Sequence, residues 1–315
     1  MTSSLSIAVL SGGISHEREV SLRSGRRVAD ALASQGHDVT IIDPDATLFS
    51  ALAELKPDLV WPALHGASGE DGALLDLLAA SGISYVGPSA QSARLAWSKP
   101  VAKTLVSRAG IATPTSITLA REAFRELGAS TVLGIIASEL GSHVVVKPAQ
   151  GGSAQGVTIV TRPEELPRAM VDAYTYADVA IIEKFIEGTE VAVTVVNTGN
   201  GPVALPAVEI VPLDGVYSFE ARYNAGETTF FVPARVSEEQ AARIADAAVE
   251  VHTTLGLDFI SRIDLILDES GTPWFLEANS LPGLTETSSA PLAIEAAGLE
   301  LGALYGSLAE LALRK

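Results

Sequence analysis

The sequence predicts a mixed α/β fold that begins with a small parallel α/β unit and continues into units with antiparallel strands. Two observations support this prediction. Short apolar runs alternate with helical patterns through the first part of the chain, which is typical of a parallel sheet. Further along, the apolar runs at 144–160 and 262–279 are each interrupted by a Gly-containing loop, which indicates antiparallel pairs.

The chain has 315 residues, of which 47% are hydrophobic, so it is long enough for two or three compact units with a large buried core. We expect the first unit at 1–94, the second at 95–187 and the third at 188–315. The segment from Glu183 to Gly188 is the expected hinge into the third unit.

The charge and the cysteine content exclude several classes of protein. With 21 basic and 38 acidic residues, the net charge of -17 argues against a nucleic-acid partner or an anionic membrane surface. The absence of cysteine rules out disulfides, thiolate zinc sites and a cysteine nucleophile. No apolar run approaches the length of a membrane span, and the N-terminus lacks the pattern of a signal peptide. We therefore expect a cytoplasmic protein that meets anionic ligands with local positive charge and backbone amides.

In the first unit, the sequence predicts a helix at 19–34 and strands at 6–10, 39–42, 59–62 and 83–86. Ligands of such sheets bind beyond the carboxyl ends of the strands. Glu17 follows the first strand, where its carboxylate would pair with a substrate ammonium; a charge that favours the helix start is the alternative. His65 follows the third strand and is expected to contact a substrate, although a single histidine is more often structural.

The second unit is expected to combine a helix at 92–109 with an antiparallel pair of strands at 144–148 and 157–160. The loop between these strands is rich in glycine, as expected where backbone N–H groups approach phosphate oxygens. Taken alone, a mobile hairpin tip is the better interpretation of this loop. Lys147 at its start favours a nucleotide phosphate, and Lys99 is the candidate for a second contact of this kind.

Two glutamates lie beside the expected hinge, which follows a predicted strand at 179–182. The carboxylates of Glu183 and Glu190 are suited to accept hydrogen bonds from an adenine amine or from ribose hydroxyls. From their spacing alone, however, solvated surface charges are the favoured interpretation.

The third unit is expected to contain a strand at 229–232, a helix at 238–255 and a closing helix from about Pro291. Tyr223 lies in the loop before the strand and is by default a packed aromatic residue with a hydrated hydroxyl. Ser288 and Ser289 precede the closing helix, so capping explains them. The same position would also bind a substrate carboxylate at the N-terminus of the helix.

The hairpin at 262–279 carries two acidic residues that are expected to face each other. If Asp264 pairs with Glu277, then Arg262 lies opposite Asn279. The register then pairs Leu267 with Trp274 and Asp268 with Pro273, and a four-residue loop, 269–272, closes it. Two carboxylates directly across a ladder repel each other, so this arrangement indicates a hard cation between them. Oxygen ligands of this kind suit Mg²⁺, which usually also binds waters and substrate phosphates.

Taken together, these motifs resemble the D-alanine–D-alanine ligases of the ATP-grasp superfamily. The match runs nearly end to end. In order, it comprises Gly-Gly-x-Ser-x-Glu-x-Glu-Val-Ser from Gly12, Ala-Leu-His-Gly-x-x-Gly-Glu-Asp-Gly from Ala63, Val-Lys-Pro from Val146 with Gly-Ser-x-x-Gly from Gly152, Glu-Ala-Arg-Tyr from Glu220, Arg-Ile-Asp from Arg262 and Leu-Glu-Ala-Asn-x-x-Pro-Gly from Leu276. Several of these motifs are common singly, but their order and spacing are specific.

The resemblance implies a three-domain ATP-grasp architecture, with ATP between the second and third domains and the substrates where all three meet. It places the following residues on the nucleotide: Lys99, Lys147, Glu183, Lys184, Phe185, Ile186, Glu190, Arg222 and Asn279. It places Asp264, Glu277 and Asn279 on two Mg²⁺ ions, with Mn²⁺ as a possible substitute.

On the substrate side, the resemblance implies a role for each of several residues. Glu17 holds the ammonium of the first D-alanine and Ser288 the carboxylate of the second, with His65 and Ser289 as further substrate contacts. Arg262 and the backbone amide of Gly283 stabilise the tetrahedral oxyanion, and Ser153 and Tyr223, hydrogen-bonded near Glu17, orient the entering amine.

The implied reaction transfers the γ-phosphoryl group of ATP to the carboxylate of the first D-alanine, and the amine of the second D-alanine then displaces phosphate. Positioning and charge stabilisation carry this chemistry, so no side-chain nucleophile is required. The resemblance also implies a role in peptidoglycan precursor synthesis and a homodimer.

Two departures from the family pattern keep alternatives open. Arg222 stands where the family commonly has lysine, and a planar guanidinium is not equivalent to an ammonium at a phosphate. Ser289-Ala290 replaces a large apolar residue near the second-substrate pocket, so D-lactate, D-serine or another amino acid is an alternative acceptor. The presence of Tyr223 favours a dipeptide product. A third hypothesis, a nucleotide- or amino-acid-binding protein without activity, is disfavoured because the metal-binding pair is present.

Overall fold

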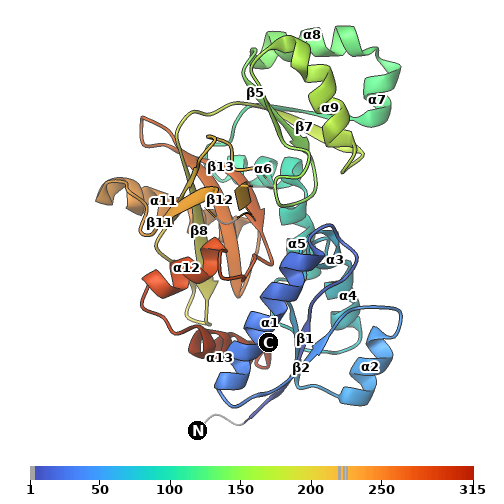
Figure 1. Ribbon diagram of the computed structural model, residues 1–315, viewed down its shortest axis with the longest axis vertical. Helices are drawn as coiled ribbons and strands as arrows, with labels where there is room; N and C mark the ends of the chain where they lie inside the picture. The colour runs from blue at the N-terminus through green and yellow to red at the C-terminus, as the bar shows by residue number, and fades with distance from the viewer. Residues whose placement is uncertain (1–3, 219–220, 223, 225) are drawn as a thin grey trace.

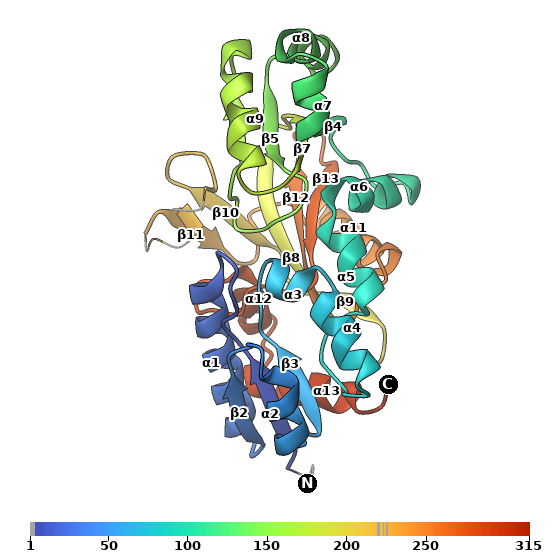
Figure 2. The same cartoon turned by 90° about the vertical axis from the view of Figure 1, so that its right-hand side faces the viewer.

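The computed structural model describes residues 4–218, 221–222, 224 and 226–315. In these residues the chain forms three sheets, and each sheet belongs to its own lobe. We name them the parallel-sheet lobe, the four-stranded lobe and the six-stranded lobe. The six-stranded lobe lies between the other two in both views (Figure 1 and Figure 2). The predicted mixed α/β fold with a parallel N-terminal unit is confirmed.

Along the chain, the parallel-sheet lobe comes first, the four-stranded lobe second and the six-stranded lobe third. The parallel-sheet lobe contains β1 (Ser6–Leu10), α1 (Arg18–Ser34), β2 (Asp38–Ile42), α2 (Leu48–Leu55), β3 (Leu59–Pro62), α3 (Ala67–Glu70) and α4 (Ala73–Ala80), and is followed by α5 (Ala90–Trp97) and α6 (Lys99–Arg108). The four-stranded lobe contains β4 (Ser116–Ala120), α7 (Arg121–Glu126), α8 (Ala129–Leu140), β5 (Val144–Pro148), β6 (Thr158–Val160), η1 (Pro163–Glu165), α9 (Leu166–Tyr174) and β7 (Val179–Lys184). The six-stranded lobe contains β8 (Thr189–Asn197), β9 (Pro202–Ala204), β10 (Val208–Pro212), β11 (Thr228–Phe231), α11 (Glu238–Thr254), β12 (Ile260–Leu267), β13 (Pro273–Asn279), α12 (Ser289–Ala296) and α13 (Leu301–Ala312).

The parallel sheet has the strand order β2-β1-β3, so the carboxyl ends of its strands meet at one edge. The strand predicted at 83–86 is wrong. Within the described residues this segment makes one isolated parallel bridge, from Tyr85 to Val60. Gly87 and Pro88 follow immediately, and proline has no N–H to continue a ladder, which explains why the pairing stops there.

Helix α1 lies close to the loop that follows β1 because the first part of its buried face is made of the small residues Ser21, Ser24 and Gly25. A Cβ at Gly25 would overlap the side chain of Ser11, so this position tolerates no side chain without a shift. The Gly12 N–H donates to Ser21 Oγ at 2.8 Å, and Ser21 Oγ donates to the Ala63 carbonyl at 2.6 Å. These bonds fix the loop after β1 to the end of β3, where the two candidate substrate residues of this lobe lie.

The four-stranded sheet is antiparallel, with the strand order β4-β7-β5-β6, and helices α8 and α9 pack on it. Side chains alternate between the two faces of a strand. Val144 and Val146 of β5 therefore enter the core beneath the helices. Val145 and Lys147 face the other way, toward the six-stranded lobe, and line a pocket there.

The largest sheet is antiparallel and follows the order β11-β10-β8-β12-β13, with β9 paired to β8. Along β12, Ile263, Leu265 and Leu267 enter a core that also contains residues of α11. The intervening Arg262 and Asp264 lie on the opposite face, which lines the pockets described below. The period of two along one strand thus separates the core from the candidate site.

The single helix predicted at 92–109 is wrong, because the structure has two helices, α5 and α6. The break lies at Ser98, which has an extended backbone (φ -88°, ψ 97°), just before Lys99-Pro100. Proline in the first turn suits a helix start but cannot continue a preceding helix. Ala102 and Val106 of α6 pack in the core of the six-stranded sheet, so α6 joins that lobe although the chain enters the four-stranded lobe next. The boundaries expected near 94 and 187 stay a prediction.

The hairpin of β12 and β13 has the predicted register at its open end and a different one near its loop. Asp264 pairs with Glu277 and Arg262 with Asn279, as predicted. Beyond Asp264 the register shifts, so Leu267 pairs with Pro273 and the predicted pairs closer to the loop are wrong. The reason is a bulge at Leu276, which has no partner in this ladder among the described residues.

The loop of the hairpin is consequently 268–272, one residue longer than expected. Asp268 closes it, because its carboxylate accepts hydrogen bonds from the Thr272 N–H at 2.9 Å, the Trp274 Nε1–H at 2.8 Å and the Ser270 hydroxyl at 2.6 Å.

The closing helix predicted from about Pro291 is two helices, α12 and α13, separated at Gly298, which has a positive φ of 70°. They lie beside α1 and share a core with β1 and β3 (Figure 1). Trp61 and Tyr305 pack there with ring centroids 5.0 Å apart. Among the described residues no single helix is long and apolar enough to cross a membrane; α12 and α13 together reach the length but are bent by 105°.

Two glycine-to-alanine substitutions in helices should change stability in opposite directions. Gly25→Ala places a methyl group against Ser11 in the tight contact between α1 and the loop after β1 and should destabilise the protein by about 1–3 kcal/mol. Gly134→Ala, in α8, meets no described atom within 4 Å and should stabilise by about 0.5–1 kcal/mol through helix propensity. Denaturant unfolding of both variants measures the difference. Equal effects would contradict the tight packing at Gly25.

Candidate active site

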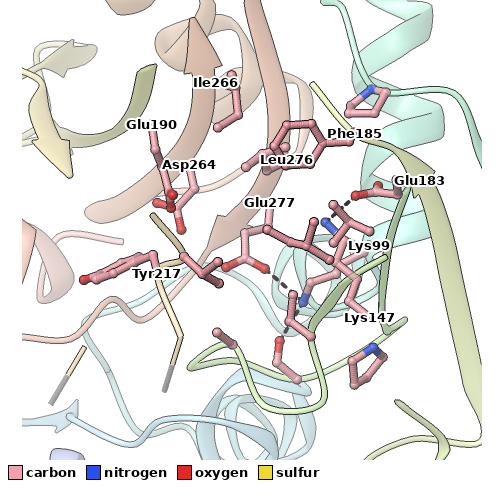
Figure 3. Close-up of a pocket in the computed structure, with 18 of the residues that line it drawn as sticks. Lys99, Lys147, Glu183, Phe185, Glu190, Tyr217, Asp264, Ile266, Leu276 and Glu277 are labelled. Carbon is pink, nitrogen blue, oxygen red and sulfur yellow. Dashed lines mark hydrogen bonds and ion pairs between the residues drawn. The ribbon is translucent and has the colours of Figure 1, made fainter. Parts of the chain in front are cut away.

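A pocket lies between the four-stranded lobe and the six-stranded lobe (Figure 3). Its walls are apolar: Val145 and Ile159 come from the four-stranded sheet, and Ile266 and Leu276 from the facing hairpin. Phe185, on the connection between β7 and β8, closes one side. Apolar walls with a few converging polar groups suit a flat aromatic group such as a nucleotide base.

The pocket contains two buried lysines, each paired with a carboxylate. Lys99, at the start of α6, has its Nζ 3.0 Å from Glu277 Oε2 and donates to the Gly151 carbonyl at 2.6 Å. Lys147, on β5, has its Nζ 2.6 Å from Glu183 Oε2. Because Gly151 belongs to the glycine-rich loop, Lys99 ties this loop to the six-stranded lobe.

The interpretation of Glu183 as a solvated surface charge is wrong. Its side chain is 2% exposed and contacts Lys103 as well as Lys147. Burial alone would raise the pKa of Glu183, but these two ammonium groups hold that pKa below its ordinary value. Figure 3 shows Glu183 beside Phe185, on the side of the pocket away from Glu190 and Asp264.

Glu190 lies next to Asp264 (Figure 3), and loss of solvent in the pocket raises the pKa of Glu190 to about 7. Glu190 is half-buried and lines the pocket, so it is not an open surface charge, although unlike Glu183 it is not fully enclosed. Almost the whole predicted nucleotide set lines the pocket: Lys99, Lys147, Glu183, Lys184, Phe185, Ile186, Glu190 and Arg222. Asn279, which was predicted with them, lines the adjoining pocket instead.

The three predicted metal ligands are brought together on one face of the hairpin. Asp264 and Glu277 are direct partners in the ladder, and Asn279 Nδ2 lies 3.4 Å from Asp264 Oδ2. Among the described residues, no three acidic or histidine side chains form a group that would hold a metal ion. The donor set of two carboxylates and an amide therefore fits Mg²⁺ that also binds phosphate oxygens, rather than zinc.

The repulsion expected between the two carboxylates is balanced by cations of this chain. Arg262 binds Asp264 with both Nε and Nη2, each at 2.8 Å, while Lys99 pairs with Glu277. Burial alone would raise the pKa of Glu277, but the positive charges of Lys99, Lys147, Arg222 and Arg262 hold it well below its ordinary value. Glu277 is thus ionised, as an oxygen ligand of a cation would have to be.

A second pocket adjoins the first at Asp264, Tyr217 and Arg222, which line both. The predicted substrate residues Glu17, His65, Ser153, Arg262, Gly283, Ser288 and Ser289 all line this second pocket. Three lobes therefore contribute to it, as the resemblance implied.

The glycine-rich loop reaches Glu17 from the four-stranded lobe. The hydroxyl of Ser153 donates to Glu17 Oε1. A Cβ at Gly152 would lie 3.0 Å from Glu17 Oε1, and one at Gly66 would lie 2.6 Å from Glu17 Oε2, so both glycines permit the close approach. Glu17 is buried and lies just before α1, where its backbone carbonyl accepts from the Ser21 N–H at 3.0 Å. It is therefore not merely a charge that favours the helix start.

His65 has contacts that hold it in place. Its Nε2 lies 2.9 Å from Ser24 Oγ and its Nδ1 lies 3.1 Å from the Leu281 carbonyl. Because Ser24 Oγ also accepts from the Leu284 N–H at 3.1 Å, its own proton is available to His65 Nε2, so His65 donates from Nδ1. Burial lowers the pKa of His65 to about 4, so the ring is neutral. His65 thus anchors the loop around Gly283 to α1.

The loop from Gly283 to Ser289 forms the far wall of the second pocket. Ser288 is the N-cap residue of α12, but no hydrogen bond from its side chain to the helix start is found among the described residues. Its Oγ instead accepts from the Thr285 N–H at 3.1 Å. The expectation that side-chain capping explains Ser288 is therefore wrong, because the loop uses that oxygen.

Several residues of the site were missed from the sequence. In the sequence, Lys103 has no feature that distinguishes it from other helix lysines, but in the fold it is buried against Glu183. Tyr217 lies in a loop that carries no recognisable motif. Arg222 stacks on Tyr217, with its guanidinium carbon 4.0 Å from the ring centroid. Tyr223, which the resemblance implied near Glu17 together with Ser153, lies outside the described residues.

Glu70 was also missed, although it belongs to the motif that follows His65. It is buried, and its Oε1 accepts from the Gly66 N–H at 3.0 Å. Burial, together with the negative charge of Glu17, raises the pKa of Glu70 to about 8. Glu70 is thus neutral near pH 7, so Glu17 does not face a second negative charge from this neighbour.

The neutral state of Glu70 should be visible in the pH dependence of stability. Because its pKa in the folded protein, about 8, exceeds the ordinary value of 4.5, its stabilising effect is complete below about pH 4.5 and is lost as the pH rises through about 8. Glu70→Gln removes this loss, so the variant should gain stability over the parent at about pH 9 and lose that advantage at about pH 5. Thermal unfolding at several pH values measures the effect. Glu54→Gln, at an exposed site on α2, is the control; parallel curves for both variants would contradict a neutral Glu70.

Comparison with known proteins agrees with this geometry. A family model described as the D-ala D-ala ligase C-terminus matches residues 105–310. The D-alanine–D-alanine ligase of Halalkalibacterium halodurans is 40% identical over 315 residues, which covers 99% of this chain and 100% of that protein.

Two solved structures resemble the whole chain. The D-alanine–D-alanine ligase from Bacillus anthracis complexed with ATP is 27% identical, with a TM-score of 0.80 and coverage of 99% of this chain and 98% of that one. The VanG D-Ala:D-Ser ligase from Enterococcus faecalis is 28% identical, with a TM-score of 0.82 and coverage of 98% and 100%. The ATP-grasp architecture implied by the motifs is thereby confirmed, and the chain belongs to the D-alanine–D-alanine ligase family.

Proposed function

We propose that this protein is an ATP-dependent ligase that joins two D-alanine molecules to D-alanyl-D-alanine and releases ADP and phosphate. One observation carries this proposal: an apolar, lysine-containing pocket and a polar pocket meet at the hairpin carboxylate Asp264. A nucleotide in the first pocket would then present its phosphates to a carboxylate substrate in the second. Family membership supports the same reaction.

The charges of the polar pocket suit an amino acid as the first substrate. Glu17, held by Ser153 and by the close approach of Gly66, would bind the ammonium group. Arg262, which lines the same pocket, lies where it would meet the carboxylate and the oxyanion that later forms there. The Gly283 N–H would be the second donor to that oxyanion.

Asp264, Glu277 and Asn279 would hold Mg²⁺, which supplies charge neutralisation at the phosphates when it is bound. Lys99 and Lys147 would add positive charge at the same end of the nucleotide, and the apolar walls would hold the base. The γ-phosphoryl group would pass to the first carboxylate, and the entering amine would displace it as phosphate. The amine is a sufficient nucleophile once the carboxylate is activated, so positioning carries this step.

The proposed product indicates the pathway in which the protein would act. D-alanyl-D-alanine would serve peptidoglycan precursor synthesis in the cytoplasm, and a homodimer stays a prediction. No nucleic-acid or membrane partner is proposed.

A different acceptor is the second candidate function, and the second-substrate wall favours its inclusion. Ser289 is buried and lines the polar pocket next to Ser288, where the family commonly has a large apolar residue. A hydroxyl at this wall would suit a polar acceptor. A similar solved structure is described as a D-Ala:D-Ser ligase, which makes D-serine the first alternative to test.

A panel of acceptors distinguishes these two candidates. With ATP and D-alanine, phosphate release and a D-alanyl-D-alanine product are expected, at a higher kcat/KM than with D-alanine plus D-serine or D-lactate. Mass spectrometry of the product identifies the acceptor. A mixed product formed in preference to the D-alanine dipeptide would favour the second candidate, and no turnover with any D-amino acid would sink both.

Removal of the charge at Glu277 tests the metal-side assignment. Glu277→Gln keeps the size of the side chain but removes one anionic ligand, so phosphate release should fall by roughly two to three orders of magnitude. Circular dichroism and Mg²⁺-dependent binding of an ATP analogue report the fold and the metal dependence separately. Glu269→Gln, in the exposed loop of the same hairpin, is the matched control and should retain activity. Unchanged turnover of Glu277→Gln would refute the assignment.

A further inference from the structure

Three buried charged side chains form a row at the edge of the nucleotide pocket. Lys103 Nζ contacts one oxygen of Glu183, and Lys147 Nζ lies 2.6 Å from the other. The side chains of Lys103, Glu183 and Lys147 are 5%, 2% and 8% exposed. Lys103 also donates to the Pro114 carbonyl at 2.9 Å. Buried charges are costly unless they are paired, so this row is held by its partners.

The row joins two lobes. Lys103 lies on α6, whose neighbouring residues Ala102 and Val106 pack in the core of the six-stranded sheet. Glu183 and Lys147 lie on adjacent strands of the four-stranded sheet, β7 and β5. Pro114 lies on the connection from α6 to β4. Lys103 therefore fixes a carboxylate of one lobe to a helix of the other.

The two lysines have different access to the pocket. Lys147 and Glu183 belong to the described residues that line it, whereas Lys103 lies behind Glu183 and outside that set. A nucleotide can therefore recruit Lys147 directly but cannot reach Lys103. When Lys147 turns to a bound nucleotide, Lys103 remains as the counter-ion of Glu183.

This difference has a chemical consequence for Glu183. A buried carboxylate without a counter-ion would take up a proton and cease to be a pure hydrogen-bond acceptor. With Lys103 on one oxygen, the other oxygen stays anionic and faces the pocket, where it can accept from the exocyclic amine of adenine. The same pairing frees Lys147 for the nucleotide.

We propose that Lys103 is a positioning residue for nucleotide recognition, which pins Glu183 as an oriented anionic acceptor while Lys147 exchanges between Glu183 and the nucleotide. This inference rests on the proposed use of ATP. It assigns a role to a residue that touches neither the nucleotide nor the amino-acid substrates.

The test compares ATP with inosine triphosphate, which carries an oxygen in place of the exocyclic amine. Lys103→Met removes the ammonium and keeps an unbranched side chain. Its affinity for a non-hydrolysable ATP analogue with Mg²⁺, measured by calorimetry, should fall about 3- to 30-fold. The KM for ATP should rise similarly, the preference for ATP over inosine triphosphate should shrink, and the KM for D-alanine should stay within about twofold. Arg108→Met, at an exposed site on the same helix, is the matched control and should change none of these values.

Lys103→Arg, which keeps the charge, should restore part of the ATP preference and serves if Lys103→Met does not fold. A Lys103→Met enzyme that is less stable but has the parent's affinity and ATP preference would overturn the inference, as would equal losses for ATP and inosine triphosphate. The calorimetric measurement needs no turnover. If the parent enzyme makes no D-alanyl-D-alanine, the proposed reaction fails, and nucleotide binding still decides the role of Lys103.

Discussion

The arrangement of the site depends on one electrostatic constraint, the juxtaposition of Asp264 and Glu277 across the β12–β13 ladder. Two anions at this spacing are stable only if cations accompany them. Arg262 neutralises Asp264 from two residues away on the same strand, whereas Lys99 reaches Glu277 from the start of α6. Lys99 is the first residue of α6, directly after the break at Ser98, so this pairing joins the start of that helix to the hairpin. Lys99 also binds the glycine-rich loop, so the same charge balance connects the six-stranded and four-stranded lobes.

Cations and anions of this site are paired in a way that suits exchange with ligands. Arg262, Lys99 and Lys147 each bind a carboxylate that the proposed function would use for metal or nucleotide recognition. A charged ligand would therefore replace one of these ion pairs with another. Each buried charge then has a partner both in the free protein and in the complex, which keeps the cost of burying it low. Lys103 differs from these three cations, because a nucleotide cannot reach it and its pairing with Glu183 is not exchanged.

The substrate end of the site follows another physical rule, the separation of neighbouring carboxyl groups into charged and neutral forms. Glu17 receives a hydrogen bond from Ser153 and lies near Arg262, while Glu70 is buried and accepts from the Gly66 N–H. Burial raises the pKa of both groups, but their mutual repulsion favours one proton in the pair, and Glu70 is the better place for it. Gly66 and Gly152 matter here because any side chain would displace the Glu17 carboxylate.

Apolar periodicity, a local property of the chain, predicted the mixed α/β class, three of the N-terminal strands and the pairing of Asp264 with Glu277. The residues that line the two pockets were implied by the order of motifs that resembles the ligase family. The tertiary structure decided what depends on distant partners. The burial of Glu183, the pairing of Lys103 and the neutral state of Glu70 arise from contacts between residues far apart in the chain or enclosed by the fold, and an isolated glutamate or lysine carries no local sign of them. The bulge at Leu276 has no local signal in the sequence, whereas the break at Ser98 does, because Pro100 cannot continue a preceding helix. The charge states of these buried groups and the register near the hairpin loop thus depend on the fold, whereas the fold class and the choice of site residues could be predicted from the order of the motifs.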